Sequence, residues 1–181
     1  YSNSDRCGCL VQMKPKYYLA ISIVILLAVG IIYVGYTSVL NTDSSGATIV
    51  KTQTKAKPFE TETIQGSKYE FTPSKQLTIF EVFASWCLPC RKSVPEAVKF
   101  QKNNKDATVV GIAYRDVDFE VKKFQDKFGS FETTIKSNGS VEDALGINDV
   151  PQTLFVVDGK VVYRLYGPAS ETDIENVYSL V

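Results

Sequence analysis

The chain has 181 residues, of which 44% are hydrophobic and 22% are charged, a composition typical of a globular protein. Its formal net charge is zero, which argues against a nucleic acid or another polyanion as a partner. The sequence contains no histidine, which excludes Cys-His and Ser-His catalysis, histidine-ligated metals and a histidine pH switch.

An uncharged apolar run, Tyr17–Tyr36, lies near the N-terminus. Twenty helical residues span about 30 Å, the thickness of the hydrocarbon core of a bilayer. Tyrosines cluster towards both ends of the run, as they do at membrane interfaces. Arg6, Lys14 and Lys16 precede the run, and no Lys or Arg follows it before Lys51. The positive-inside rule therefore places the N-terminus in the cytoplasm and the C-terminal part outside.

This run has two alternative interpretations, a buried globular helix and a cleaved signal peptide. A globular helix is expected to show a polar face, and this run is apolar all round. Signal peptides have apolar regions of about 7–15 residues followed by a small-x-small site. The weak candidate for such a site, Ser45-Gly46-Ala47, lies well beyond the end of the run. We therefore favour an uncleaved membrane anchor that contacts lipid through Tyr17–Tyr36.

The sequence predicts four regions. Met13 is the sole methionine and resembles a natural start, so residues 1–12 are expected to be a fragment of a longer sequence or an extraneous extension. We predict a cytoplasmic segment over residues 1–16 and a transmembrane anchor over residues 17–36. Residues 37–57 are rich in Thr, Ser, Asp, Lys and Gly without apolar periodicity, which predicts a flexible linker. Residues 58–181 are predicted to form one folded domain.

Strand and helix patterns alternate from about Phe59. The predicted elements, in chain order, are a strand over Leu77–Ala84, a helix over Cys87–Asn104 interrupted at Pro95, a strand over Thr108–Tyr114, a helix over Asp118–Phe128 ended by Gly129, a short helix over Val141–Leu145 ended by Gly146, a hairpin of Thr153–Val157 and Lys160–Tyr166 around Asp158-Gly159, and a last helix whose capping box is Ser170 and Asp173. This order predicts an α/β fold in which one sheet mixes parallel and antiparallel strands.

Trp86-Cys87-Leu88-Pro89-Cys90 lies between the first predicted strand and the following helix. The sulfur of Cys87 would sit at the helix N-terminus, where free N–H groups stabilise a thiolate, with Cys90 one turn away. Zinc needs four ligands and covalent haem needs a histidine after the pair, whereas the exported part offers two cysteines and Arg91 follows. A structural disulfide with so short a loop would add little stability. The pair therefore indicates redox chemistry without a metal or another cofactor.

Glu81 alternates with Ile79 and Phe83 in the strand before this pair, so it shares a face with apolar side chains. Desolvation there would raise its pKa and make it a proton acceptor near neutral pH. The alternative is a glutamate at the strand end that reaches water.

Two further groups of residues follow this pair. Tyr114 ends the second predicted strand, and Arg115 and Asp116 follow it directly. These three residues could line a groove at the active site, or they could form a solvated loop. The aromatic residues of the next helix and its flank are expected to be core; they are Phe119, Phe124, Phe128 and Phe131.

These segments resemble the thioredoxin superfamily, and most of all the membrane-tethered reductases of cytochrome c maturation (the CcmG/DsbE group) and the related TlpA/ResA proteins. The resemblance covers roughly residues 60–168 and is carried by Phe83–Cys90, Pro95, Val110–Asp116 and Gly146–Phe155. It implies a thioredoxin-like mixed sheet flanked by helices, preceded by one transmembrane helix, with thiol–disulfide exchange outside the cytoplasmic membrane.

The resemblance also implies roles for individual residues. Cys87 would attack a substrate disulfide and Cys90 would resolve the mixed disulfide. Glu81 stands six residues before Cys87, at the position of thioredoxin's buried carboxylate, and would deprotonate Cys90.

Substrate binding is expected to involve Trp86 and the segment Val150-Pro151, which corresponds to the cis-proline loop of the family. A cis bond would turn the Val150 backbone toward an extended substrate strand; the alternative is a trans proline that starts a strand. The maturation reductases usually carry glutamate after this proline, whereas this chain carries Gln152.

The expected function is the reduction of disulfides in apocytochrome c or its chaperone, on the periplasmic side of the cytoplasmic membrane. A membrane thiol-electron transporter would supply the electrons, because a reductase outside the cytoplasm must be recharged across the bilayer. Two alternatives stay open. The protein could oxidise thiols or reduce other exported proteins, or it could be a thioredoxin-like module that binds a partner without turnover.

Overall fold

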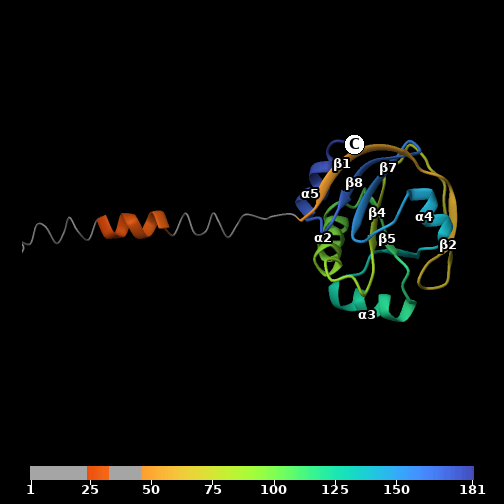
Figure 1. Cartoon of the computed structure of the whole chain (residues 1–181), viewed down its shortest axis with the longest axis horizontal. Helices are drawn as coiled ribbons and strands as arrows, with labels where there is room; N and C mark the ends of the chain where they lie inside the picture. The colour runs from red at the N-terminus through yellow and green to blue at the C-terminus, as the bar shows by residue number, and fades with distance from the viewer. Residues whose placement is uncertain (1–23, 33–45) are drawn as a thin grey trace, which may run out of the picture. The chain divides into compact units, whose positions relative to one another are not determined.

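The structure is a computed structural model that describes residues 24–32 and 46–181 (Figure 1). The chain divides into two units, Tyr1–Ser44 and Ser45–Val181. Residues 24–32 are helical and lie inside the predicted anchor, whose other residues are outside the described ranges. Among the residues described, no helix is both long enough and apolar enough to cross a bilayer. The predicted cytoplasmic segment over residues 1–16 also lies outside these ranges.

The second unit is built on a six-stranded mixed sheet in the order β1-β8-β7-β4-β5-β6, with a separate hairpin of β2 and β3. The strands are β1 (Thr48–Lys55), β2 (Phe59–Glu62), β3 (Lys68–Phe71), β4 (Thr78–Phe83), β5 (Thr108–Ala113), β6 (Thr133–Lys136), β7 (Gln152–Val157) and β8 (Lys160–Tyr166). β4, β5 and β6 are parallel, whereas β7 runs antiparallel to both of its neighbours, β4 and β8. The predicted α/β fold with a mixed sheet is confirmed.

Helices cover both faces of this sheet. They are α2 (Cys90–Asn103), α3 (Asp118–Phe128), α4 (Gly139–Leu145) and α5 (Glu171–Tyr178). One apolar core contains the inward side chains of α2, α3 and α5, and a second contains those of α4 and of the β2–β3 hairpin. Figure 1 shows α2 and α5 on the side of the sheet opposite to α4 and β2. Every residue of β4 is buried, because this central strand is covered on both faces.

The predicted linker over residues 37–57 is wrong in its second half. β1 occupies Thr48–Lys55 and pairs antiparallel with β8, so the folded unit begins before residue 58. β1 is an edge strand with exposed side chains along most of its length, which is why its sequence shows no apolar alternation. The strands β2, β3 and β6 also have no counterpart among the predicted elements, because each is only four residues long.

The first helix of the domain differs from its prediction at two points. It begins at Cys90 rather than Cys87, because Pro89 is the N-cap and the preceding residues form a turn. It also continues without interruption through Pro95. A proline removes one backbone donor, and the burial of Val94, Ala97 and other side chains along this helix offsets that loss.

The other helices agree more closely with the sequence. α3 has the predicted bounds, and Gly129 follows as its C-cap. Ser170 and Asp173 form the predicted capping box of α5, with both reciprocal hydrogen bonds present. The aromatic prediction is wrong for Phe119, which is 68% exposed at the outer face of α3, whereas Phe124 and Phe131 are buried.

Candidate active site

The cysteine pair lies where the central strand β4 meets helix α2. Cys87 and Cys90 form a disulfide, with their Cα atoms 5.3 Å apart. The backbone N–H of Cys90, the first residue of α2, donates a hydrogen bond of 3.2 Å to the Cys87 sulfur. No acidic residue occupies the first turn of α2. In the reduced state these features favour negative charge on Cys87, because the N–H group and the helix dipole stabilise a thiolate.

Exposure differs sharply around the pair. Both cysteines are buried, whereas Trp86 is 60% exposed and Leu88 is also exposed. A partner that approaches Cys87 therefore meets the Trp86 and Leu88 side chains first. This position is consistent with the predicted role of Trp86 in substrate binding.

Glu81 is fully buried in β4, which confirms the predicted burial and excludes the alternative of a solvated strand end. The Thr153 hydroxyl donates a hydrogen bond of 2.7 Å to Glu81 Oε2. Burial raises the pKa of Glu81 to about 7, although the hydroxyls of Thr153 and Ser93 act in the opposite direction. Glu81 can therefore exchange a proton near neutral pH.

The second oxygen of Glu81 faces an unusual environment. Neither Glu81 Oε1 nor the buried hydroxyl of Ser93 has a hydrogen-bond partner among the described residues. Ser93 lies one helical turn after Cys90, and both residues are on the buried face of α2. Ser93 lowers the pKa of Glu81 slightly, so the carboxyl group lies near the helix that carries Cys90.

The peptide bond between Val150 and Pro151 is cis, as the resemblance implied. Val150 packs against the apolar core that contains Cys87 and Cys90. The next residue, Gln152, pairs with Val82 of β4, so Val150 and Pro151 lie at the end of the sheet where β4 leads into the cysteines. The structure therefore brings this loop and the redox pair together.

A buried hydrogen-bond network supports the loop from behind. The Arg164 guanidinium donates to Gln152 Oε1 and, at 2.7 Å, to the carbonyl oxygen of Leu145 at the end of α4. The Gln152 amide in turn donates at 3.0 Å to the carbonyl oxygen of Asp149. Because Arg164 is buried, these neutral acceptors solvate its charge. Gln152 is thus a neutral partner for this arginine.

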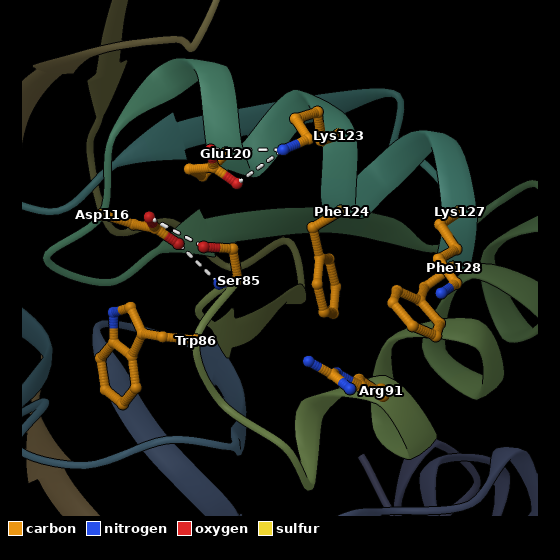
Figure 2. A pocket seen from close by; sticks show the side chains of 9 residues that line it. All are labelled: Ser85, Trp86, Arg91, Asp116, Glu120, Lys123, Phe124, Lys127 and Phe128. Atoms are coloured by element: carbon orange, nitrogen blue, oxygen red, sulfur yellow. Dashed lines mark hydrogen bonds and ion pairs between the residues drawn. The ribbon is translucent and has the colours of Figure 1, made fainter.

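On the opposite side of the redox pair, a groove lies between the Ser85-Trp86 segment and α3. It has a volume of about 590 Å³, and Figure 2 shows the side chains that line it. Asp116 closes one end, where Ser85 N–H donates to Oδ2 at 2.5 Å and the Ser85 hydroxyl donates to Oδ1 at 3.0 Å. Of the three residues after β5, Asp116 lines this groove, whereas Tyr114 is buried and Arg115 pairs with Glu142.

Several supporting residues are absent from the sequence prediction. Thr153, Ser93 and Arg164 carry no local signal, because ordinary strand and helix patterns accommodate all three. A correct pairing of β4 with β7 would have identified Thr153, which lies opposite Glu81 in that pair. Among the residues that the structure describes, no cluster of three or more Cys, Asp or Glu side chains could hold a metal ion.

Comparison with known proteins agrees with this geometry. The sequence matches the Redoxin family over residues 51–181. It is 28% identical to the thiol-disulfide oxidoreductase ResA of Bacillus subtilis, over 93% of this chain and 96% of that protein. It is 30% identical over 103 residues to the thiol:disulfide interchange protein CycY of Rhizobium leguminosarum, which covers 55% of each protein. This chain therefore spans about half the length of CycY.

Solved structures show the same fold. A thioredoxin-family thiol:disulfide interchange protein from Chlorobium tepidum matches with a TM-score of 0.63 and 24% identity, over 72% of this chain and 97% of that one. A secreted disulfide oxidoreductase from Mycobacterium tuberculosis matches with a TM-score of 0.61 and 18% identity, over 68% and 96%. The chain belongs to the Redoxin family, and it is a thiol–disulfide oxidoreductase of the CcmG/DsbE/ResA group with the thioredoxin fold.

Proposed function

We propose that this protein reduces disulfides in apocytochrome c, or in a chaperone that carries it, on the outer side of the cytoplasmic membrane. The observation that carries the proposal is the combination of a helix-start dithiol with a fully buried carboxyl group whose pKa is about 7. The likeness to the cytochrome c maturation reductases supports this choice of substrate.

In the first step, the Cys87 thiolate attacks one sulfur of the substrate disulfide. The substrate S–S bond breaks, a mixed disulfide forms between Cys87 and one substrate cysteine, and the other substrate cysteine leaves as a thiolate that takes up a proton. The Cys90 N–H and the N-terminus of α2 stabilise the attacking thiolate.

In the second step, Cys90 resolves the mixed disulfide. Glu81 accepts the proton of the Cys90 thiol, and the resulting thiolate attacks the Cys87 sulfur. The second substrate cysteine leaves as a thiolate, and the Cys87–Cys90 disulfide forms. A carboxyl group with a pKa near 7 suits this task because it is deprotonated in about half of the molecules at neutral pH.

Val150 and Pro151 position the substrate in this proposal. Their loop lies beside the cysteines, and its backbone groups would pair with an extended substrate segment. Trp86 would contact the same segment from its exposed position.

The proposed location rests on the apolar run Tyr17–Tyr36 and on the basic residues before it. A membrane thiol-electron transporter would reduce the Cys87–Cys90 disulfide after each turnover, supplying two electrons and two protons.

The experiment uses the reduced full chain and an oxidised peptide that contains a Cys-x-x-Cys-His haem-attachment motif. We expect one peptide disulfide to be reduced for each chain, with formation of the Cys87–Cys90 disulfide detected by mass. Cys90→Ser should stop at a mixed disulfide on Cys87, and Cys87→Ser should not react.

Redox equilibration with glutathione gives the direction of electron flow. A reduction potential well above about −150 mV would mark an oxidant and contradict the proposal, because known strong oxidants lie in that range. A Cys90→Ser chain that captures no partner covalently in cells would favour the non-catalytic alternative.

A further inference from the structure

We propose that the groove between the Ser85-Trp86 segment and α3 binds an acidic segment of the substrate protein, next to its reacting cysteine. This inference rests on the proposed function and names a feature of its substrate. The groove lies beside the redox pair, because Trp86 precedes Cys87 and Arg91 follows Cys90, and both line it.

The sheet order places the groove and the cis-proline loop on opposite sides of Cys87. β4 lies between β7 and β5. The Val150-Pro151 loop leads into β7 on one side, and Asp116 with α3 follows β5 on the other. A substrate chain bonded to Cys87 therefore extends from the cis-proline loop on one side of its cysteine to the groove on the other.

The acidic residues of the groove already have partners within the protein. Asp116 accepts hydrogen bonds from Ser85 and, at 2.8 Å, from the backbone N–H of Val117. Glu120 forms an ion pair with Lys123 at 3.3 Å. Figure 2 shows both interactions along one part of the groove. Lys123 offsets the charge of Glu120, whereas Asp116 keeps its negative charge at the Ser85 end of the groove, because its donors are neutral.

Besides Lys123, the groove contains two cations, Arg91 and Lys127. Among the described residues, neither Arg91 nor Lys127 forms an ion pair. Both lie near the Phe128 ring, with the Arg91 guanidinium 5.9 Å and the Lys127 amine 5.4 Å from its centroid. Figure 2 shows Lys127 of α3 beside the Phe128 ring and Arg91 reaching from α2 to a position below the Phe124 ring. Both charges are therefore close to a segment that packs around Phe128.

The charge of the groove differs from that of the unit as a whole. Residues 46–181 carry 17 basic and 18 acidic side chains, whereas the groove has three basic and two acidic ones. The aromatic rings of Phe124, Phe128 and Trp86 add apolar surface for the backbone and stems of a bound segment. A volume of about 590 Å³ is within the ordinary range of binding sites. The groove thus fits a short segment that combines apolar and acidic side chains.

The test compares three disulfide probes on the reduced full chain in a non-ionic detergent. Two are peptides with the same cysteine loop, flanked on both sides by Asp or by Lys, and the third is neutral bis(2-hydroxyethyl) disulfide. Each rate is divided by the rate of the same probe with dithiothreitol, which removes intrinsic differences in reactivity. We expect a roughly tenfold preference for the Asp peptide at low ionic strength, lost in about 0.5 M NaCl.

Lys127→Glu is the informative variant, with Lys122→Glu as its matched control. Both lysines are exposed on α3, but only Lys127 lines the groove. Lys127→Glu should slow reduction of the Asp peptide roughly three- to tenfold and leave the neutral disulfide unchanged, whereas Lys122→Glu should change neither. If the charge reversal impairs folding, Lys127→Gln replaces it in the test. This variant should show a smaller loss of rate on the Asp peptide.

Equal losses with Lys122→Glu and Lys127→Glu would overturn the inference, as would equal losses on the Asp peptide and the neutral disulfide. If the wild-type chain reduces the neutral disulfide but does not prefer the Asp peptide to the Lys peptide, the inference is overturned and the proposed function is not. A chain that reduces none of the probes would overturn the proposed function and this inference with it.

Discussion

The Thr153 hydroxyl donates a 2.7 Å hydrogen bond to Glu81 Oε2 across the antiparallel pair of β4 and β7. This is the single hydrogen bond that the described residues give to a fully buried carboxyl group. The protonation of Glu81 therefore depends on opposing effects, since burial raises its pKa and the hydroxyls of Thr153 and, to a smaller extent, Ser93 lower it.

The raised pKa of Glu81 predicts that the oxidised protein loses stability as the pH rises. The folded state keeps the Glu81 proton up to a pH of about 7, whereas the unfolded chain releases it near 4.5. Stability is therefore lost between these values, by roughly 3 kcal/mol for the whole shift. Glu81→Gln should remove this loss, which urea unfolding at pH 5 and pH 8 would measure.

Glu175→Gln is the matched control, because Glu175 is exposed on α5. The free energy of unfolding of this variant should change with pH in the same way as that of the wild type. An identical slope for Glu81→Gln and the wild type would contradict the assignment of a raised pKa to Glu81.

Thr153→Val removes the donor and should raise the pKa of Glu81 further. At neutral pH less carboxylate is then available to accept the Cys90 proton, so resolution should slow. The pH dependence of resolution should move up by roughly one unit. The decay of a mixed disulfide between Cys87 and a chromophoric thiol, followed from pH 6 to 9, measures this.

Thr153→Ser keeps a hydroxyl at the same place and should behave like the wild type. A profile for Thr153→Val that coincides with the wild-type profile would show that Glu81 does not control resolution.

Arg164→Met should destabilise the protein by roughly 2–4 kcal/mol, because it leaves two buried oxygens, Gln152 Oε1 and the Leu145 carbonyl, without donors. The loss of this support behind the cis-proline loop should also slow reduction of a protein disulfide more than reduction of a small one. Lys160→Met, at an exposed position of the same strand, is the control for both measurements. Equal stability of the two variants in urea would refute the prediction.

Gly111→Ala should destabilise the fold by roughly 1–3 kcal/mol, since a Cβ atom there would lie 2.5 Å from a ring atom of Phe131. The added methyl group forces the Phe131 ring out of the core beside β5. Gly139→Ala at the start of α4 meets no atom within 4 Å and should be neutral. Thermal unfolding of the two variants would separate a steric effect from a general effect of replacing glycine.

Local spacing was sufficient to predict the redox pair and most helices. Cys87 and Cys90 are three residues apart, so one turn of chain brings them together wherever it lies in the fold. The bounds of α3 and the capping box of α5 are likewise set by neighbouring residues. The edge strand β1 escaped prediction because its pairing with β8 comes from backbone groups, and its exposed side chains carry no pattern.

The sequence by itself determined the chemistry available to this protein: a dithiol at a helix start, a carboxyl group in a central strand and no histidine. Only the tertiary structure decided which groups surround that dithiol. Thr153 reaches Glu81 across 72 residues of chain, and Asp116 reaches Ser85 across 31. Such contacts depend on strand order and register, which follow from packing the whole sheet rather than from any local pattern.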